Sequence, residues 1–258
     1  MRYKIRCWTL WVILASLALV PAVLWAAEVR VAVASNFLLP LKSLAPQYQQ
    51  ASGDTLRISA GSTGKLTAQI INGAPFDVFL SANSREPKRL KEQGLGVAGS
   101  RFTYALGQLV LWAPQMKSQH EDMLTTLRGG RFRRLSLANP RTAPYGAAAM
   151  EVLERLGLKT QLQAKIIRSD NVSQAYQYVA TGAAEMGFVA LSQIQVHGAE
   201  GQGHYWTVDT SLYAPIRQQA LLLKTGEGNA AARRFLQYLR SAAGREAIKS
   251  FGYGVTSL

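Results

Sequence analysis

Four times along this chain, a short run of apolar residues stops at small polar residues or glycine, and a helical pattern begins at once. Such alternation of strands and helices is typical of an α/β fold with a largely parallel sheet. Each helical pattern also ends near a glycine, at Gly53, Gly73, Gly157 and Gly182. The four polar junctions are Ser35-Asn36, the GSTG segment from Gly61 to Gly64, the RTAPYG segment from Arg141 to Gly146, and Asn171-Val172.

These junctions admit two interpretations. Taken singly, each is explained by N-capping, in which Ser, Thr, Asn or Asp accepts hydrogen bonds from the free N–H groups of a helix's first turn. Taken together, they indicate a ligand site, because in open α/β sheets ligands bind beyond the carboxyl ends of the strands, where helix N-termini converge. The N–H groups and helix dipoles at such a place attract an anion.

The residue types at the junctions favour a cradle without formal charge. Hydroxyl groups donate as well as accept hydrogen bonds, and glycines let the backbone approach a ligand closely. The charged residues in these loops are Lys65, Arg141 and Asp170, and none stands at the centre of a junction. We expect Lys65 and Arg141 to face solvent and Asp170 to cap its own helix. The predicted ligand is therefore a small dianion held by neutral donors.

The first 27 residues form a separate unit. A basic MRYKIR segment precedes a long apolar run, and the small residues that follow suit cleavage after Ala26 or Ala27, which predicts a secretory signal peptide. An uncleaved membrane anchor is the alternative, since the run is near spanning length. The single cysteine, Cys7, lies inside this segment, so we expect the mature chain to fold without disulfides or thiol ligands.

The rest of the chain is long enough to bury a substantial core, in one large domain or two lobes. It is strongly basic: the formal charge is +14 for the whole chain and +11 without Arg2, Lys4 and Arg6. Nucleic acid, an anionic membrane surface or a small anionic ligand would each suit this charge. The densest basic stretch, Arg128 to Arg134, lacks the aromatic interleaving of a stacking platform, so we interpret it as a solvated face.

Several catalytic and cofactor patterns do not fit. The GSTGK segment departs from the phosphate-binding P-loop pattern, because Ser59 stands where the first glycine should be and Leu66 follows the lysine. The three histidines are scattered and lack metal-ligand spacing. No histidine, cysteine or glutamate falls in any of the four junctions, so an activated nucleophile or base is missing there. We therefore expect no enzymatic activity, no cofactor and no residue that ligates a metal directly.

As an ordered set, several segments resemble the periplasmic molybdate-binding proteins of ABC-type molybdate importers. The resemblance covers about Val29 to Val255 and is carried by VAVASNF, GSTGKLTAQIINGAPFDVFLSA, GQLVLWAP, NPRTAPYGAAAMEVLERLG, DNVSQAYQYVATGAAEMGFVALSQ and FGYGV. It implies an α/β fold of the two-lobed type II periplasmic binding protein kind. Each lobe would be a mainly parallel sheet flanked by helices, with the ligand in the interlobe cleft. Lobe 1 would comprise residues 28–107 plus 213–258, and lobe 2 residues 108–212.

The resemblance also implies which residues bind the oxyanion. In lobe 1, Ser35 would give its hydroxyl and its backbone N–H, and Asn36 would add a further donor. In the GSTG segment the aligned donor is Thr63, with Ser62 as the near alternative.

In lobe 2, the resemblance implies that Tyr145 and Val172 give backbone N–H groups. One position departs from the pattern: some family members place a tyrosine hydroxyl in the pocket where this chain has Ala190. We expect Asn36 to compensate for the missing donor.

The function implied by the resemblance is that of a monomeric periplasmic protein. It would capture molybdate, with tungstate as co-ligand, for the membrane permease of an ABC importer, and would bind no nucleic acid. A binding protein for sulfate, phosphate or another tetrahedral oxyanion is the alternative, and an exported hydrolase on the same scaffold is a more distant one. Hydrogen phosphate would need an acceptor for its proton, and Asp170 is the nearby candidate.

Overall fold

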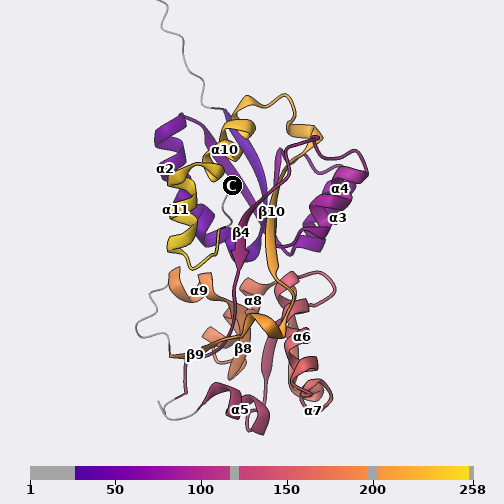
Figure 1. Cartoon of the computed structure of the whole chain (residues 1–258), viewed down its shortest axis with the longest axis vertical. Coiled ribbons are helices and arrows are strands. Elements are labelled where there is room, and N and C mark those ends of the chain that lie inside the picture. Colours follow the sequence, from indigo (N-terminus) through magenta and orange to yellow (C-terminus); the bar gives the residue numbers. More distant parts are fainter. Residues whose placement is uncertain (1–26, 117–121, 197–202, 256–258) are drawn as a thin grey trace, which may run out of the picture.

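The computed structural model describes residues 27–116, 122–196 and 203–255. The predicted signal peptide lies outside the described residues, except for Ala27. The described chain forms two bodies stacked along the long axis of the molecule, each built on one five-stranded sheet with helices around it (Figure 1). We name the body that contains the first strand lobe 1 and the other lobe 2.

The sheet of lobe 1 has the strand order β2-β1-β3-β10-β4. Strand β1 pairs in parallel with β2 and β3, whereas β10 runs antiparallel to both β3 and β4. One strand of five is therefore reversed, and the sheet is mainly parallel. Its strands are β1 Glu28–Ala34, β2 Thr55–Gly61, β3 Val78–Ser81, β4 Phe102–Gly107 and β10 Ile216–Leu222.

The sheet of lobe 2 repeats this plan with the order β7-β6-β8-β5-β9. Strand β6 pairs in parallel with β7 and β8, and β5 runs antiparallel to both β8 and β9. Every side chain of β5, β6 and β8 is buried, as expected for central strands that are covered on both faces. The strands are β5 Leu109–Ala113, β6 Leu135–Ala138, β7 Ile166–Ser169, β8 Met186–Ala190 and β9 His204–Thr207.

Helices cover both faces of each sheet, and the four glycines expected to end helical patterns all adopt a positive φ. In lobe 1 the helices are η1 Ser35–Phe37, α2 Leu38–Ser52, α3 Thr63–Ile71, α4 Arg85–Glu92, η4 Lys224–Gly226, α10 Ala230–Arg240 and α11 Ala242–Ser250. In lobe 2 they are α5 Met123–Gly129, α6 Pro144–Arg155, α7 Lys159–Leu162, η2 Gln163–Lys165, α8 Val172–Ala180, α9 Leu191–Val196 and η3 Thr210–Leu212. Within the described residues, no helix has both the length and the apolar character needed to cross a membrane.

Separate hydrophobic clusters hold the helices to each sheet. In lobe 1, one face packs against α2 and α10 through residues such as Leu41 and Phe235, and the other packs against α3 and α4 through Leu66 and Leu90. In lobe 2, the larger cluster joins the sheet to α5 and α6, and a smaller one joins it to α8. In the smaller cluster, the rings of Trp112 and Tyr176 stack with centroids 4.7 Å apart.

The chain crosses between the lobes twice. It leaves lobe 1 between β4 and β5, and it returns between η3 and β10. The crossing strands β4 and β10 lie side by side, with Gly107 paired to Ile216 (Figure 1). The predicted fold class, a two-lobed α/β protein of the type II periplasmic binding protein kind, is confirmed.

Candidate functional site

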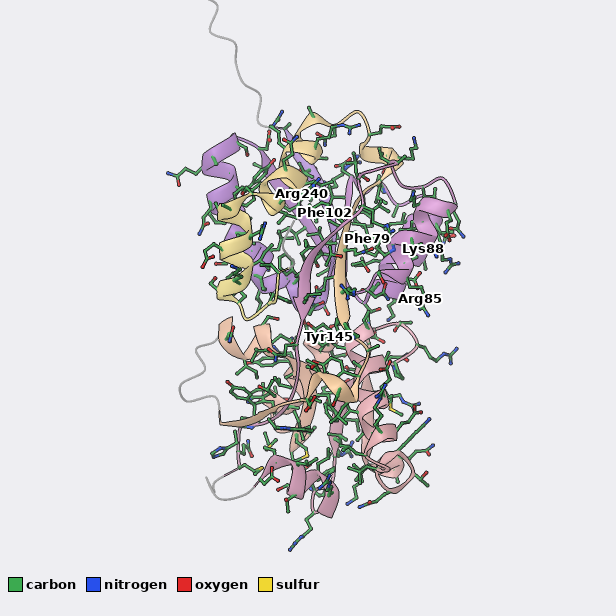
Figure 2. The ribbon with its side chains drawn as sticks, in the orientation of Figure 1. Phe79, Arg85, Lys88, Phe102, Tyr145 and Arg240 are labelled. Carbon is green, nitrogen blue, oxygen red and sulfur yellow. The ribbon has the colours of Figure 1, made fainter. Side chains whose placement is uncertain are left out.

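The four junctions meet at one small cavity between the lobes. In lobe 1, strands β1 and β2 are followed by η1 and α3. In lobe 2, strands β6 and β7 are followed by α6 and α8. The N-termini of these four helices lie at the cavity. The cavity has a volume of about 10 Å³. All six residues singled out in the sequence line it, and each exposes 7% or less of its surface: Ser35, Asn36, Ser62, Thr63, Tyr145 and Val172. Tyr145 marks the place in Figure 2, where the two lobes touch.

N-capping does not account for three of the four junctions. No side chain caps η1, α3 or α6, whose N-cap residues are Ala34, Ser62 and Ala143. Among the helices at the four junctions, α8 alone has a side-chain N-cap, where Asn171 Oδ1 accepts from the Gln174 backbone N–H at 3.1 Å. The expectation that Asp170 caps this helix is therefore wrong, because Asn171 stands at the cap position.

The first N–H groups of a helix have no partner within the helix. At this cavity they belong to the residues that open each helix, namely Ser35 and Asn36 in η1, Thr63 in α3 and Val172 in α8. Pro144 occupies the first position of α6 and has no N–H, which makes Tyr145 the first donor of that helix. The first residues of helices from four chain segments thus line one cavity, where helix dipoles favour an anion.

Two hydroxyl groups of the GSTG segment also lack acceptors for their hydrogen atoms. Ser62 Oγ is buried and has no hydrogen-bond partner within the described residues. Thr63 Oγ1 accepts from the Ala82 backbone N–H at 3.1 Å, which leaves its own hydrogen free to donate. A buried polar group without a partner costs about 1–3 kcal/mol, so a ligand that accepts hydrogen bonds would relieve this cost.

The cavity carries no formal charge, since none of the residues that line it in the described chain is acidic or basic. Lys65 does not reach it, because Lys65 Nζ lies 2.7 Å from Asp170 Oδ2. Arg141 is exposed, as expected. A small anion at this point would be held by neutral donors alone.

A buried network of side chains lies behind the cavity, and sequence reasoning missed it. Asn36 Nδ2 donates to Gln218 Oε1 at 2.8 Å and to the Tyr253 hydroxyl at 3.0 Å. The Tyr253 hydroxyl donates back to the Asn36 carbonyl at 2.9 Å, and Ser192 Oγ of lobe 2 lies 2.9 Å from the same hydroxyl. The bonded residues lie between 61 and 217 positions apart in the chain, so no local sequence pattern predicts these bonds.

This network changes the role expected of Asn36. Both hydrogen atoms of its amide are committed to Gln218 and Tyr253, so the donor that Asn36 can turn toward the cavity is its backbone N–H. Its amide therefore does not replace the tyrosine hydroxyl that other family members have at the position of Ala190. Ala190 itself is buried, and its backbone N–H donates to Gln193 Oε1 at 3.1 Å.

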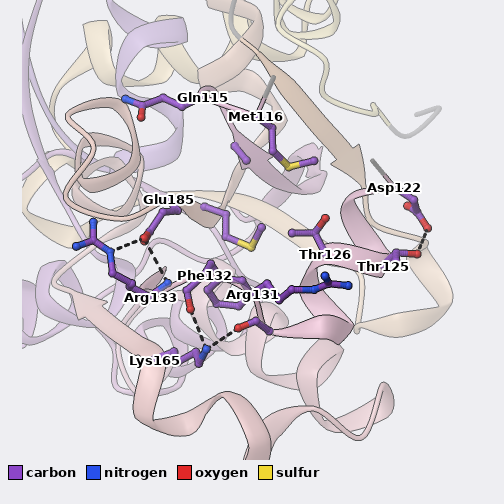
Figure 3. A pocket seen from close by; sticks show the side chains of 13 residues that line it. Gln115, Met116, Asp122, Thr125, Thr126, Arg131, Phe132, Arg133, Lys165 and Glu185 are labelled. Atoms are coloured by element: carbon purple, nitrogen blue, oxygen red, sulfur yellow. Dashed lines mark hydrogen bonds and ion pairs between the residues drawn. The ribbon is translucent and has the colours of Figure 1, made fainter. Parts of the chain in front are cut away.

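A larger cavity of about 920 Å³ lies elsewhere, among the described residues of lobe 2 (Figure 3). Several of its polar side chains bind one another or the backbone. Arg133 pairs with Glu185 at 2.9 Å, and Lys165 donates to the carbonyl groups of Gly130 and Phe132. Figure 3 shows these groups facing each other and not a common centre. We therefore place the candidate site at the small interlobe cavity, where donors are left without acceptors.

Fold and site together define a class, the two-lobed binding proteins that enclose a small solute between their lobes. The chain belongs to the bacterial extracellular solute-binding protein family, whose model matches residues 29–254.

Two curated relatives are similar to most of the chain. The molybdate-binding protein ModA of Azotobacter vinelandii is 47% identical over 230 residues, which is 89% of this chain and 91% of the relative. ModA of Rhodobacter capsulatus is 43% identical over 228 residues, or 88% of each chain. Among solved structures, the A. vinelandii periplasmic molybdate-binding protein superposes with a TM-score of 0.85 at 40% identity, covering 89% of this chain and all of that one.

Proposed function

We propose that this protein captures molybdate, and also tungstate, in the interlobe cavity and presents it to the membrane permease of an ABC importer. The observation that carries the proposal is that uncapped helix N-termini and the buried, unpartnered Ser62 hydroxyl line one neutral cavity. The similarity to molybdate-binding proteins over most of the chain supports this choice of ligand.

The ligand residues that we propose are Ser35, Asn36, Thr63, Tyr145 and Val172, with Ser62 as a further donor. A hydrogen bond to a charged group contributes about 1.5–3 kcal/mol net. Six such bonds of about 2 kcal/mol or more each, less an association cost of ~4 kcal/mol, give micromolar or tighter binding.

An all-donor cavity suits an oxyanion that is fully deprotonated. Hydrogen phosphate would need an acceptor for its proton, and the carboxylate considered for that role, Asp170, is paired with Lys65. Sulfate, which is also a dianion, stays the alternative ligand, and it differs from molybdate in size.

Binding is proposed to close residues 28–107 plus 213–258 onto residues 108–212. Several direct contacts join the lobes beside the cavity. Among them, Gly64 N–H donates to the Thr142 carbonyl at 2.9 Å, Ser173 Oγ donates to the Ser35 carbonyl at 2.9 Å, and Lys65 pairs with Asp170. A permease that recognises the closed form would thereby distinguish loaded from empty protein. The protein would perform no chemistry and need no cofactor.

We propose that the protein works as a monomer in the periplasm, after export directed by residues 1–27. N-terminal sequencing of protein recovered from the periplasm tests this directly. A mature chain that begins at Ala27 or Glu28 supports export with cleavage, whereas a retained Met1 in the membrane fraction contradicts it.

Isothermal titration of the mature protein with sodium molybdate, sodium tungstate and sodium sulfate tests the ligand. We expect micromolar or tighter binding of molybdate and tungstate and much weaker binding of sulfate. The absence of heat with both molybdate and tungstate, at protein concentrations where micromolar binding is visible, would overturn the proposal.

A further inference from the structure

Gln218 lies where the returning strand β10 enters the sheet of lobe 1, and its side chain is completely buried. In the ladder between β10 and β4, Gln218 pairs with Ala105 and Gln219 pairs with Thr103. Tyr104 is thus an extra residue in β4, forming a β-bulge of the kind that redirects a side chain. The bulge brings the Tyr104 hydroxyl to 3.0 Å from Gln218 Oε1.

The amide of Gln218 links two residues of the proposed anion site that belong to different lobes. Its oxygen accepts from Asn36 Nδ2 of lobe 1 at 2.8 Å. Its nitrogen donates to the Tyr145 hydroxyl of lobe 2 at 3.2 Å. Asn36 and Tyr145 each stand in the first turn of a helix whose N-terminus faces the cavity, and each is 98% buried.

We propose that Gln218 is a positioning residue for the bound oxyanion. By holding the side chains of Asn36 and Tyr145, it sets the spacing of two backbone N–H groups that reach the anion from opposite lobes. The inference rests on the proposed function, because it concerns the geometry of that same site. Gln218 does not line the cavity and acts only through its two partners.

The packing around this link leaves it little freedom. A Cβ atom added at Gly107, in the first crossing between the lobes, would lie 2.3 Å from the Tyr145 hydroxyl oxygen and 2.8 Å from Gln218 Nε2. The first connection between the lobes therefore lies in close contact with the hydrogen bond between Gln218 and Tyr145. Because this bond joins residues of different lobes, we expect a rotation of one lobe against the other to change its geometry. The position of the Tyr145 backbone N–H would then depend on the arrangement of the lobes.

The link is also electrically neutral. Burial, with a smaller contribution from neighbouring tyrosines, raises the pKa of the Tyr145 hydroxyl well above its ordinary value. The hydroxyl therefore stays protonated and can accept from Gln218 without placing a negative charge beside the anion.

A purely structural role for Gln218 predicts a different result from a positioning role. Loss of a structural hydrogen bond lowers the melting temperature and leaves the dissociation constant of the folded protein almost unchanged. Loss of a positioning bond weakens binding, and the losses at its two ends are not additive, because removal of either end breaks the same bond.

The experiment compares wild type, Gln218→Leu, Tyr145→Phe and the double variant, by titration with sodium molybdate and by thermal unfolding without ligand. Tyr145→Phe keeps the backbone N–H and removes only the hydroxyl. We expect each single variant to bind about 10-fold more weakly or worse, and the double variant to lose no more than about threefold beyond the worse single variant. The control is Tyr48→Phe, which removes a buried hydroxyl in lobe 1 far from the cavity and should lower the melting temperature alone.

Single variants that bind within threefold of wild type, or losses that multiply in the double variant, would overturn the positioning role. If Gln218→Leu does not fold, Tyr145→Phe decides by the same threefold limit. Wild-type protein that gives no heat with molybdate would overturn the proposed function itself, so the two failures are distinguishable.

Discussion

Lys65 and Asp170 form an ion pair between the lobes, with Lys65 Nζ 2.7 Å from Asp170 Oδ2. Lys65 lies in the first turn of α3 in lobe 1, and Asp170 immediately precedes the N-cap of α8 in lobe 2. The pair thus joins two helices whose N-termini face the cavity. Because each charge is neutralised by the other, we expect neither to act as a formal partner of the anion, and we expect the pair to contribute to the proposed closure.

Replacement of Lys65 by methionine tests this contribution. Both side chains are more than half exposed, and exposed pairs contribute about 0.2–1 kcal/mol. We expect Lys65→Met to weaken molybdate binding by no more than about 5-fold at low salt, and by less as added salt screens the pair. The control, Lys88→Met, removes an exposed pair with Glu92 inside α4 and should leave binding unchanged. A loss much larger than 5-fold would mean that Lys65 meets the anion directly.

The hydroxyl of Ser62 gives a second prediction, in which affinity and stability move differently. Ser62→Ala removes a buried hydroxyl that has no partner within the described chain, so the ligand-free melting temperature should stay constant or rise. Molybdate binding should weaken about 10-fold or more, because a charge-assisted hydrogen bond is lost.

The matched control is Ser136→Ala. Ser136 Oγ is fully buried in lobe 2 and donates to the Ala175 carbonyl at 3.1 Å. This variant should lower the melting temperature and leave the affinity unchanged. If Ser62→Ala binds as tightly as wild type, Thr63 is the sole hydroxyl donor of the GSTG segment.

Gly64 gives a third prediction, about the approach of the two lobes. Its backbone N–H donates to the Thr142 carbonyl, and an added Cβ would lie 3.1 Å from Thr142 backbone atoms. Gly64→Ala should therefore hinder closure and weaken binding by about 3- to 10-fold, with little change in the stability of the ligand-free protein. Gly228→Ala is the control, because a Cβ there meets nothing within 4 Å. Equal affinities for these two variants would show that the lobes do not need to approach this closely.

The sequence was enough to predict the junctions because their signals are local. A strand that ends in Ser-Asn or Gly-Ser-Thr-Gly, followed by a helical pattern and a glycine, depends only on neighbouring residues. The meeting of the junctions then follows from the rule that parallel strands end at one edge of a sheet. The strand reversals at β5 and β10 were not visible in any local pattern.

The roles of individual groups depended on contacts between distant residues. Asn36 was expected to compensate for the missing tyrosine donor, but its side-chain amide donates to Gln218 and Tyr253, near the other end of the chain. Asp170 was expected to cap a helix, but its carboxylate pairs with Lys65 across the lobes. In each case a side chain had two possible partners of similar chemistry, and tertiary packing decided between them.

The pH dependence of binding and of stability should differ, because the cavity and the network behind it contain different groups. No titratable side chain other than Tyr145 lines the cavity in the described chain, and burial raises the pKa of that tyrosine hydroxyl well above its ordinary value. The molybdate dissociation constant, measured by titration, should therefore stay constant between about pH 6 and pH 9. A change near pH 6.5, the ordinary range of histidine, would contradict a neutral all-donor cavity.

Stability should fall in alkali. Burial raises the pKa of Tyr253 from 10.0 to about 12, and it raises the pKa of Tyr104 well above 10.0. Because the folded-state pKa lies above the unfolded value, the stabilisation is fully present below about pH 10 and is lost as the pH rises through the folded-state pKa. Urea unfolding followed by tryptophan fluorescence should show a constant free energy of unfolding from about pH 8 to 9.5 and a decline from pH 10 to 12.

Tyr253→Phe should reduce the slope of this decline, since the variant has one phenol fewer to keep protonated. An equal slope in the variant and in wild type would mean that Tyr253 is not the group whose ionisation the fold resists.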